Sequence, residues 1–157
     1  MRGLGLRDAR LDAAVIGHSG TSAGVWRMNP AYFEIRFRIS DSSLAWPPEF
    51  AIISAYATTG ETWSPRQNLD ADKALNAALN ERSVWHARVE GYSPGTGHAE
   101  PSWAAEVGSE DGRRLGRMFH QHAIFCVSGD LLSVTLCRGG QPAVDIGSFR
   151  SRLDPVV

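Results

Sequence analysis

The polar side chains that could do chemistry are densest between His86 and Trp103, where the sequence reads HARVEGYSPGTGHAEPSW. Glu90 and Glu100 stand on either side of a loop rich in glycine and proline. If the flanking strands pair as a hairpin, the two carboxylates could approach each other, and paired carboxylates can divide acid and base work. The alternative is that one carboxylate caps loop amides while the other faces water. Glu100 is therefore a candidate catalytic acid or base, and Glu90 is a candidate ligand contact.

Ser102 is the second candidate catalytic residue, because it follows Glu100 by two positions and would face the same side of a strand. A serine nucleophile needs a base within reach. His98, His120 and His122 could supply that base, although only their residue type points to this role. The sequence leaves open whether the protein is an enzyme.

Phosphate-loop and metal chemistry have weaker support. The glycines of residues 91–97 are followed by neither Gly-Lys-Ser/Thr nor a G-x-G-x-x-G pattern that opens a helix, so a wide turn is the simpler interpretation. His98 with Glu100, and His120 with His122, have the spacing of paired metal ligands on a strand, but no cysteine joins them. We therefore expect no metal site, and the sequence points to no particular cofactor.

Composition excludes several classes of partner. The chain has 157 residues, a formal net charge of −1 and a pI near 6.5, and its arginines are scattered among acidic residues. Nucleic-acid binding needs clustered cations, and a membrane span needs roughly 18–20 apolar residues, so we expect neither partner. Cys126 and Cys137 are too few for a disulfide framework and are typical of a reducing cytosol. Lys73 is the sole lysine, a bias typical of a GC-rich bacterial genome. We expect a cytoplasmic protein.

Two segments with strand patterns precede the first expected helix. Residues 32–39, YFEIRFRI, alternate apolar and charged side chains, which predicts a half-buried strand. Residues 50–57, FAIISAYA, form a continuous apolar run, which favours a strand buried on both faces. Thr58 follows this run directly, and open α/β sheets place ligands at the carboxyl ends of central strands. Thr58 is therefore a candidate ligand contact, with a plain strand-to-helix connection as the alternative.

The first helix is expected from Ser64 to about Arg82. Ser64 and Gln67 have the spacing of a capping box, and an apolar stripe follows at helical spacing. Asn68 would project from the core-facing side of the first turn, where its amide must find hydrogen bonds. It either braces the loop of residues 58–63 or contacts a ligand.

The second half of the chain repeats the alternation of strands and helix. Strands are expected at 84–90, from at or after Pro101 to Val107, at 122–127 and at 131–137, with a possible short strand near 143–149. A second helix should begin at Ser109 and turn Leu115, Met118 and Phe119 inward, and Gly129-Asp130 has the composition of a two-residue hairpin turn. The order β-β-α-β-β-α-β-β predicts an α+β fold in which one mixed sheet carries two helices.

We expect one globular domain over residues 28–150, with residues 151–157 as a tail. Residues 1–27 are rich in Gly, Ser and Arg and poor in apolar side chains. Two interpretations of them remain open, a flexible leader or a start codon assigned too early, with a structured N-terminal element as the less favoured alternative.

Several short motifs between Phe50 and about Cys137 resemble the bacterial and phage family of unknown function DUF3293. The family pattern has an apolar strand ending in Thr-Ala-x-Asn-Pro, a helix with an early Asn, a Glu-x-Ser after a loop, and Phe-Gly-Gln running into Ala-Ile-Phe. The corresponding residues here are Ser54–Thr58, Asn68, Glu100-Pro101-Ser102 and Phe119–Phe125. Asn-Pro is replaced by Ala57-Thr58, and the glycine before Gln121 by His120. The resemblance implies no activity, but it implies that Asn68, Glu100, Ser102 and Gln121 belong to one site.

Two hypotheses follow. In the first, Asn68, Glu100, Ser102 and Gln121 form a pocket for a small polar molecule, and Glu100 could act as an acid or base. In the second, the same residues are a structural hydrogen-bond network, and an exposed edge or aromatic surface meets another protein. That surface would hold Trp46, Trp63, Trp85 and Trp103. The substrate, the cofactor and the oligomeric state are not specified by the sequence.

Overall fold

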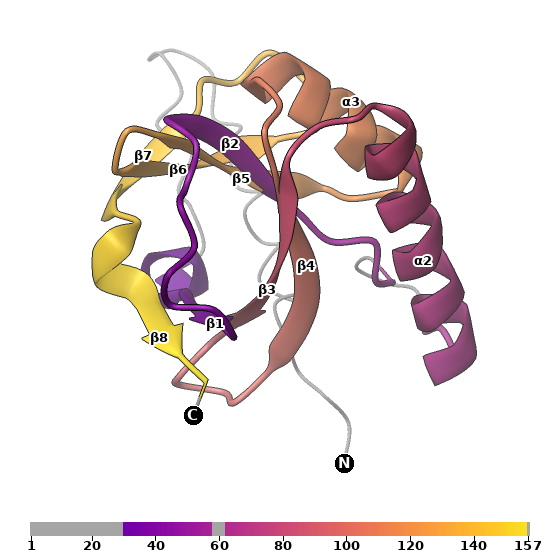
Figure 1. Cartoon of the computed structure of the whole chain (residues 1–157), viewed down its shortest axis with the longest axis horizontal. Helices are drawn as coiled ribbons and strands as arrows, with labels where there is room; N and C mark the ends of the chain where they lie inside the picture. The colour runs from indigo at the N-terminus through magenta and orange to yellow at the C-terminus, as the bar shows by residue number, and fades with distance from the viewer. Residues whose placement is uncertain (1–29, 58–61, 157) are drawn as a thin grey trace, which may run out of the picture.

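The computed structural model describes residues 30–57 and 62–156, so the N-terminal residues 1–27 and Thr58 lie outside the described part. Within that part the strands are β1 (Arg36–Ile39), β2 (Glu49–Ile53), β3 (His86–Tyr92), β4 (Ala99–Ala105), β5 (Ala123–Ser128), β6 (Leu131–Leu136), β7 (Val144–Ser148) and β8 (Leu153–Pro155). The helices are α2 (Pro65–Glu81) and α3 (Ser109–Met118), with short 3₁₀ helices η1 (Pro30–Glu34) and η2 (Arg150–Arg152). The strands form one mixed sheet in the order β7-β6-β5-β2-β4-β3-β1-β8 (Figure 1). The expected α+β fold is confirmed.

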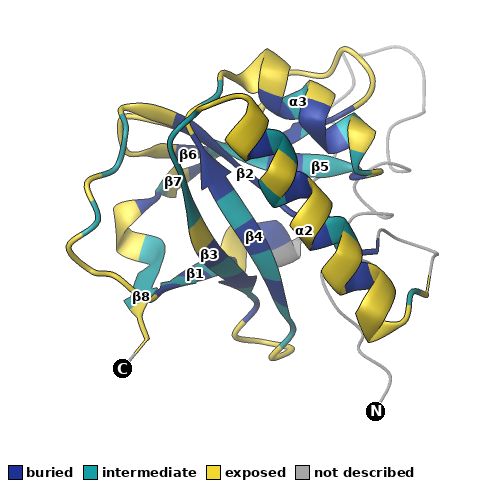
Figure 2. Cartoon of the chain, turned by 45° about the vertical axis from the view of Figure 1, so that its right-hand side comes forward, coloured by how far each residue is buried: buried dark blue, intermediate teal, exposed yellow. Residues whose placement is uncertain are grey.

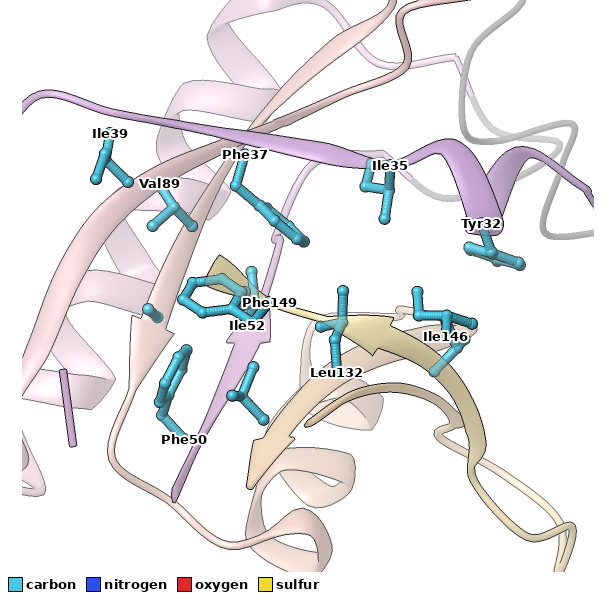
Figure 3. Close-up of a cluster of buried hydrophobic side chains, with 13 residues drawn as sticks. Tyr32, Ile35, Phe37, Ile39, Phe50, Ile52, Val89, Leu132, Ile146 and Phe149 are labelled. Carbon is cyan, nitrogen blue, oxygen red and sulfur yellow. The ribbon is translucent and has the colours of Figure 1, made fainter. Parts of the chain in front are cut away.

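The sheet is curved strongly enough for its two halves to face each other. Three strands separate β1 from β5 in the sheet order, yet the ring of Phe37 on β1 lies 5.5 Å from that of Phe125 on β5. Figure 3 shows the side chains of β1 pointing across the interior towards Phe149, Leu132 and Ile146. We call the surface that these apolar residues line the interior face of the sheet.

Both helices pack on the opposite surface, which we call the helix face (Figure 2). Side chains of β2 alternate between the two surfaces: Ile52 points to the interior, whereas Ala51 and Ile53 pack under the helices. As expected, this strand is buried on both faces, but it ends at Ile53 rather than at Ala57. Leu75 and Leu79 supply the buried stripe of α2.

Helix α3 lies unusually close to the sheet because two of its inward positions are glycines. A Cβ atom added at Gly112 would lie 2.9 Å from Cδ1 of Ile124, and one added at Gly116 would lie 2.5 Å from Sγ of Cys137. Glycine permits such close backbone approach. The expected inward position of Met118 is wrong, because its side chain is 57% exposed and the two glycines flank Leu115 on the buried side instead.

The connection β2-α2-β3 joins parallel strands, because β2 and β3 each pair antiparallel with the strand β4 between them. The hairpin of β5 and β6 has the expected register, with Cys126 opposite Ser133. Gly129 adopts φ +63° at its turn, which glycine tolerates. The two cysteines are therefore far apart on the ladder, as expected.

Three further boundaries differ from the sequence expectations. Residues 30–34 form η1, so β1 starts only at Arg36. Strand β4 contains Pro101, because β2 has already ended there and the missing N–H group faces no partner strand. Residues 153–155, expected within a tail, form β8, which pairs parallel with β1. No helix of the described residues is both long and apolar enough to cross a membrane.

Candidate functional site

Three of the predicted site residues come together on the interior face. Glu100 and Ser102 point inward from β4, Gln121 enters from the link between α3 and β5, and Ser54 joins them from the end of β2. We call these four residues the interior polar cluster. They line a cavity of about 20 Å³ together with apolar side chains such as Phe37 and Phe125. A volume of this size accommodates about one water molecule.

The serines of the interior polar cluster bond to the backbone of the strands that carry them. The Ser54 hydroxyl donates to the Pro101 carbonyl at 3.2 Å and accepts from the Tyr56 N–H at 3.1 Å. The Ser102 hydroxyl donates to the Glu100 carbonyl at 3.3 Å. Ser54 thus links the end of β2 to β4, whereas the Ser102 bond stays within β4.

Gln121 also holds the segment that follows β2, through the backbone of Tyr56. Its Nε2 donates to the carbonyls of Tyr56 at 2.9 Å and Phe119 at 3.1 Å. The side chains of Glu100, Ser102 and Gln121 are buried, with 3%, 6% and 4% of their residue surface exposed. The geometry therefore places a compact hydrogen-bonded network, closed to bulk solvent, where the sequence predicts a site.

Asn68 does not line that cavity but supports it from the helix face. Its Oδ1 accepts a hydrogen bond from the Ala57 N–H at 2.8 Å, and the residue is buried. The expectation that Asn68 braces the loop of residues 58–63 stays a prediction, because residues 58–61 lie outside the described part and the observed bond is to Ala57, just before that loop. This bond fixes the segment after β2, which carries Ser54 and Tyr56, against the first turn of α2.

Glu90 lies on the opposite side of the sheet from Glu100, so the proposed pair of carboxylates is wrong. The β3–β4 hairpin forms as expected, but its register places Gly91 opposite Glu100 and Glu90 opposite Pro101. An offset of one residue turns a strand side chain to the other face. Glu90 instead accepts a hydrogen bond from Nη1 of Arg38 at 2.8 Å.

The loop that follows β3 contains a pattern that resembles a hydrolase motif. Residues 91–95 read G-Y-S-P-G, which fits the G-x-S-x-G nucleophile elbow of α/β hydrolases. That elbow requires a turn from a strand into a helix, whereas this loop joins β3 to β4. Ser93 is also buried, and its N–H donates to the His98 carbonyl at 2.9 Å. The loop is a hairpin connection, as its glycines predict.

A second polar cluster, which sequence reasoning missed, fastens α2 to the sheet. Arg88 donates to both carboxylate oxygens of Asp72, at 2.8 and 2.6 Å, and its guanidinium lies 3.8 Å above the ring of Trp103. The Trp103 indole also donates to Asp72 at 3.2 Å. Burial raises the pKa of the nearby Tyr56 hydroxyl, and the negative charge of Asp72 adds to this effect. The carboxylate of Asp72 is buried and accepts from both partners, whereas the Arg88 side chain remains 41% exposed, so the cluster is a half-exposed ion pair between α2 and the sheet.

The expected aromatic surface does not form as a continuous exposed patch. Trp46 and Trp85 pack against the interior core, with 5.8 Å between their ring centroids. Trp103 packs against the core under the helices. These indoles therefore serve mainly to cover the two hydrophobic clusters.

A much larger hollow lies on the helix face beside α3, and we call it the α3 groove. It has a volume of about 530 Å³. Helix α3 has ten residues and sits tightly over β2 and β5. On this side of β6 and β7, Ser133 is partly exposed and Asp145 is exposed, whereas Thr135 is buried. Polar residues that line the groove include Glu49, Ser109, Arg113, Ser133, Thr135 and Asp145.

The wall of the α3 groove includes the guanidinium of Arg113 and the thiol of Cys126. Nη2 of Arg113 donates to Glu110 at 2.7 Å, whereas its Nε is buried and makes no hydrogen bond within residues 30–57 and 62–156. Burial raises the pKa of the Cys126 thiol to about 11, against a smaller lowering by the charge of Arg113. The thiol is therefore protonated at neutral pH and is a poor nucleophile.

A shallower hollow adjoins the groove at Arg113 and Gly140, which line both. It has a volume of about 480 Å³, and we call it the arginine depression. Its charged lining residues are Glu110, Arg113, Arg117 and Arg138. Helical spacing places Glu110, Arg113 and Arg117 on one side of α3, but only the fold brings Arg138 of the β6–β7 loop beside them.

No three His, Cys, Asp or Glu side chains converge as metal ligands in the described part of the chain. No curated protein and no solved structure matches the sequence. The match to a known family covers the centre of the chain, somewhat less than the 50–137 suggested by the motifs, and includes all four members of the interior polar cluster. Residues 53–124 match the model of the family described as "Protein of unknown function (DUF3293)", which confirms the resemblance seen in the sequence.

Proposed function

We propose that this protein binds a small polar molecule in the α3 groove, and that the interior polar cluster serves to stabilise the fold. The difference in size between the two hollows carries the proposal. The groove has a volume of about 530 Å³ and the interior cavity about 20 Å³. Binding sites for small molecules usually measure roughly 300–1,000 Å³, so the groove has the capacity that the interior cavity lacks.

The groove also offers the mixture of groups that a polar ligand needs. Ser133 contributes a hydroxyl from β6, Arg113 contributes a cation from α3, and Asp145 contributes a carboxylate from β7. Ser133 and Asp145 face each other across the β6–β7 ladder. Donors and acceptors therefore converge from a helix and two strands, which are rigid supports for a site.

We also propose a structural role for the residues that the sequence predicts as a site. Glu100, Ser102 and Gln121 are buried. The Ser102 hydroxyl bonds to the backbone of its own strand, and Gln121 joins the carbonyls of Tyr56 and Phe119. Asn68 extends this network to α2. We propose that these residues hold the end of β2 in place, and the proposal assigns no acid or base chemistry to Glu100.

A cytoplasmic location in a bacterium is consistent with this proposal. Cys126 and Cys137 are not bonded to each other, as expected in a reducing compartment. The partner proposed for the α3 groove is a small molecule rather than a nucleic acid or a membrane.

A thermal-shift screen of polar metabolites tests the function. A ligand at 100 times its Kd stabilises the folded state by about 2.7 kcal/mol, which raises the unfolding temperature by several degrees in a chain of this size. Each hit is then measured on Ser133→Phe, which fills the groove, and on Ala77→Phe, which adds the same ring at an exposed position on α2. We expect the shift to persist in Ala77→Phe and to disappear in Ser133→Phe. Equal shifts in both variants, or no hit at all, would contradict the proposal.

A further inference from the structure

The arginine depression carries an excess of positive charge beside the α3 groove. Three guanidinium groups line it, from Arg113, Arg117 and Arg138, against one carboxylate. That carboxylate, Glu110, lies 2.7 Å from Arg113 and 4.0 Å from Arg117. Arg138 is exposed, and no hydrogen bond or ion pair of its side chain occurs in the described ranges. Two positive charges in this hollow are therefore not balanced by a neighbouring carboxylate.

We propose that the ligand is a phosphorylated, hydroxyl-rich small molecule, with its phosphate in the arginine depression and its remaining part in the α3 groove. This inference rests on the proposed function and names the class of ligand. A phosphate monoester carries about −1.5 to −2 charges at pH 7, which matches the excess of two. Guanidinium groups bind phosphate oxygens with paired, charge-assisted hydrogen bonds.

Arg113 connects the two halves of the proposed site. It lines both hollows, and its buried Nε has no hydrogen-bond acceptor within the described residues. A buried N–H without an acceptor costs free energy. A phosphate oxygen near the junction of the hollows would supply that acceptor, since Nη2 is already engaged by Glu110.

The lining of the groove favours hydroxyl groups over a flat aromatic ring. Phe50 is the sole aromatic residue among the groove-lining residues of the described chain, and it is buried in the core. A nucleobase would therefore find no exposed ring for stacking. The Ser133 hydroxyl can instead donate to and accept from the hydroxyls of a sugar or polyol, and the Asp145 carboxylate can accept from them.

The test is a titration of the full-length, ¹⁵N-labelled protein with inorganic phosphate, ribose 5-phosphate, glucose 6-phosphate and the corresponding unphosphorylated sugars. Inorganic phosphate should shift the Nε–H resonance of Arg113 and the backbone amides of Arg138 and Gly139. At least one sugar phosphate should also shift the amides of Ser133 and Asp145. It should bind at least ten times more tightly than its unphosphorylated sugar.

Two charge-reversal variants separate a specific site from general attraction of anions. Arg138→Glu should weaken sugar phosphate binding at least tenfold. Arg82→Glu changes an exposed arginine near the end of α2 and should weaken it less than twofold. The inference is overturned if phosphate leaves the Arg113 Nε–H unmoved, or if the two variants lose affinity equally.

The failure of this inference can be distinguished from the failure of the proposed function. If an unphosphorylated hit is lost in Ser133→Phe but binds normally to Arg138→Glu, the groove is a ligand site and the phosphate assignment is wrong. If phosphate binds at Arg113 and Arg138 but no sugar phosphate shifts the amides of Ser133 and Asp145, the arginine depression is a phosphate site and the groove proposal is wrong.

Discussion

Glu90 and Glu100 flank one hairpin loop but point to opposite faces of the sheet, because Gly91 rather than Glu90 lies opposite Glu100. The interior polar cluster therefore contains one carboxylate, from Glu100, and Glu90 pairs with Arg38 on the other face. An acid and base couple across this loop is geometrically excluded. The interior polar cluster is a hydrogen-bonded network that connects the segment after β2 to β4 and to the link before β5. We therefore expect substitutions in it to change the stability of the fold.

Gln121→Ala should destabilise the fold by about 1–3 kcal/mol, because the buried amide is lost and two partly buried carbonyls lose a donor. Urea denaturation measures this change. The exposed Asn80→Ala on α2 serves as the control and should stay within about 0.5 kcal/mol of the parent. A loss for Gln121→Ala no larger than that of the control would show that the network does not stabilise the fold.

Asn68→Ala should cost about 1–2 kcal/mol, because the Ala57 N–H then loses its acceptor in a buried position. Asn68→Asp keeps an oxygen that can accept the same hydrogen bond and is the matched variant. It should retain more of the stability than the alanine variant at neutral pH. If the two substitutions cost the same in denaturant unfolding, Asn68 does not act through this bond.

Gly116→Ala should cost about 1–3 kcal/mol through overpacking, because the new methyl group would lie 2.5 Å from Sγ of Cys137. Gly108→Ala is the control, since a Cβ at Gly108 meets no atom within 4 Å. Thermal unfolding of both variants checks the difference. Equal stability of the two variants would mean that a methyl group at residue 116 fits, and hence that α3 lies farther from Cys137 than the structure places it.

The pairing of β1 with β8 should depend on pH at the acidic end. Hydrogen bonds from Arg36 and then from Tyr92 lower the pKa of Asp154 to about 2. A folded-state pKa below the unfolded value, about 3.9, adds stability above pH 4 that is lost as the pH falls through about 2. Because these side chains are partly exposed, the contribution is small.

Asp154→Asn tests that pH dependence. The urea midpoint of the parent should fall more steeply between pH 4 and pH 2 than that of the variant, and a carboxyl NMR titration of Asp154 should give a low pKa. Parallel pH profiles for the two proteins would contradict a depressed pKa at this position.

Local patterns predicted most of the elements of this fold. The capping box of Ser64 and Gln67 marks the start of α2, and Gly129-Asp130 marks the β5–β6 turn, because each depends on neighbouring residues alone. The alternation of Glu100 and Ser102 correctly placed both on one face of β4.

The remaining features depend on how distant segments meet. The position of Glu90 follows from a register offset of one residue, which the hairpin pattern does not specify. Glycine disfavours a helix, so the local sequence gives no reason for Gly112 and Gly116 within α3. Their close approach to β5 and Cys137 explains why glycine occupies both positions. The α3 groove and arginine depression combine α3, β6 and the β6–β7 loop, which no short motif links.

The most direct test of the central claim is the position of a bound hit from the metabolite screen in a crystal structure of the complex. The account predicts density between the first turn of α3 and strand β6, in contact with Arg113 and Ser133. Density at the interior polar cluster, beside Glu100 and Gln121, would contradict it and would return the site to the residues that the sequence first indicated.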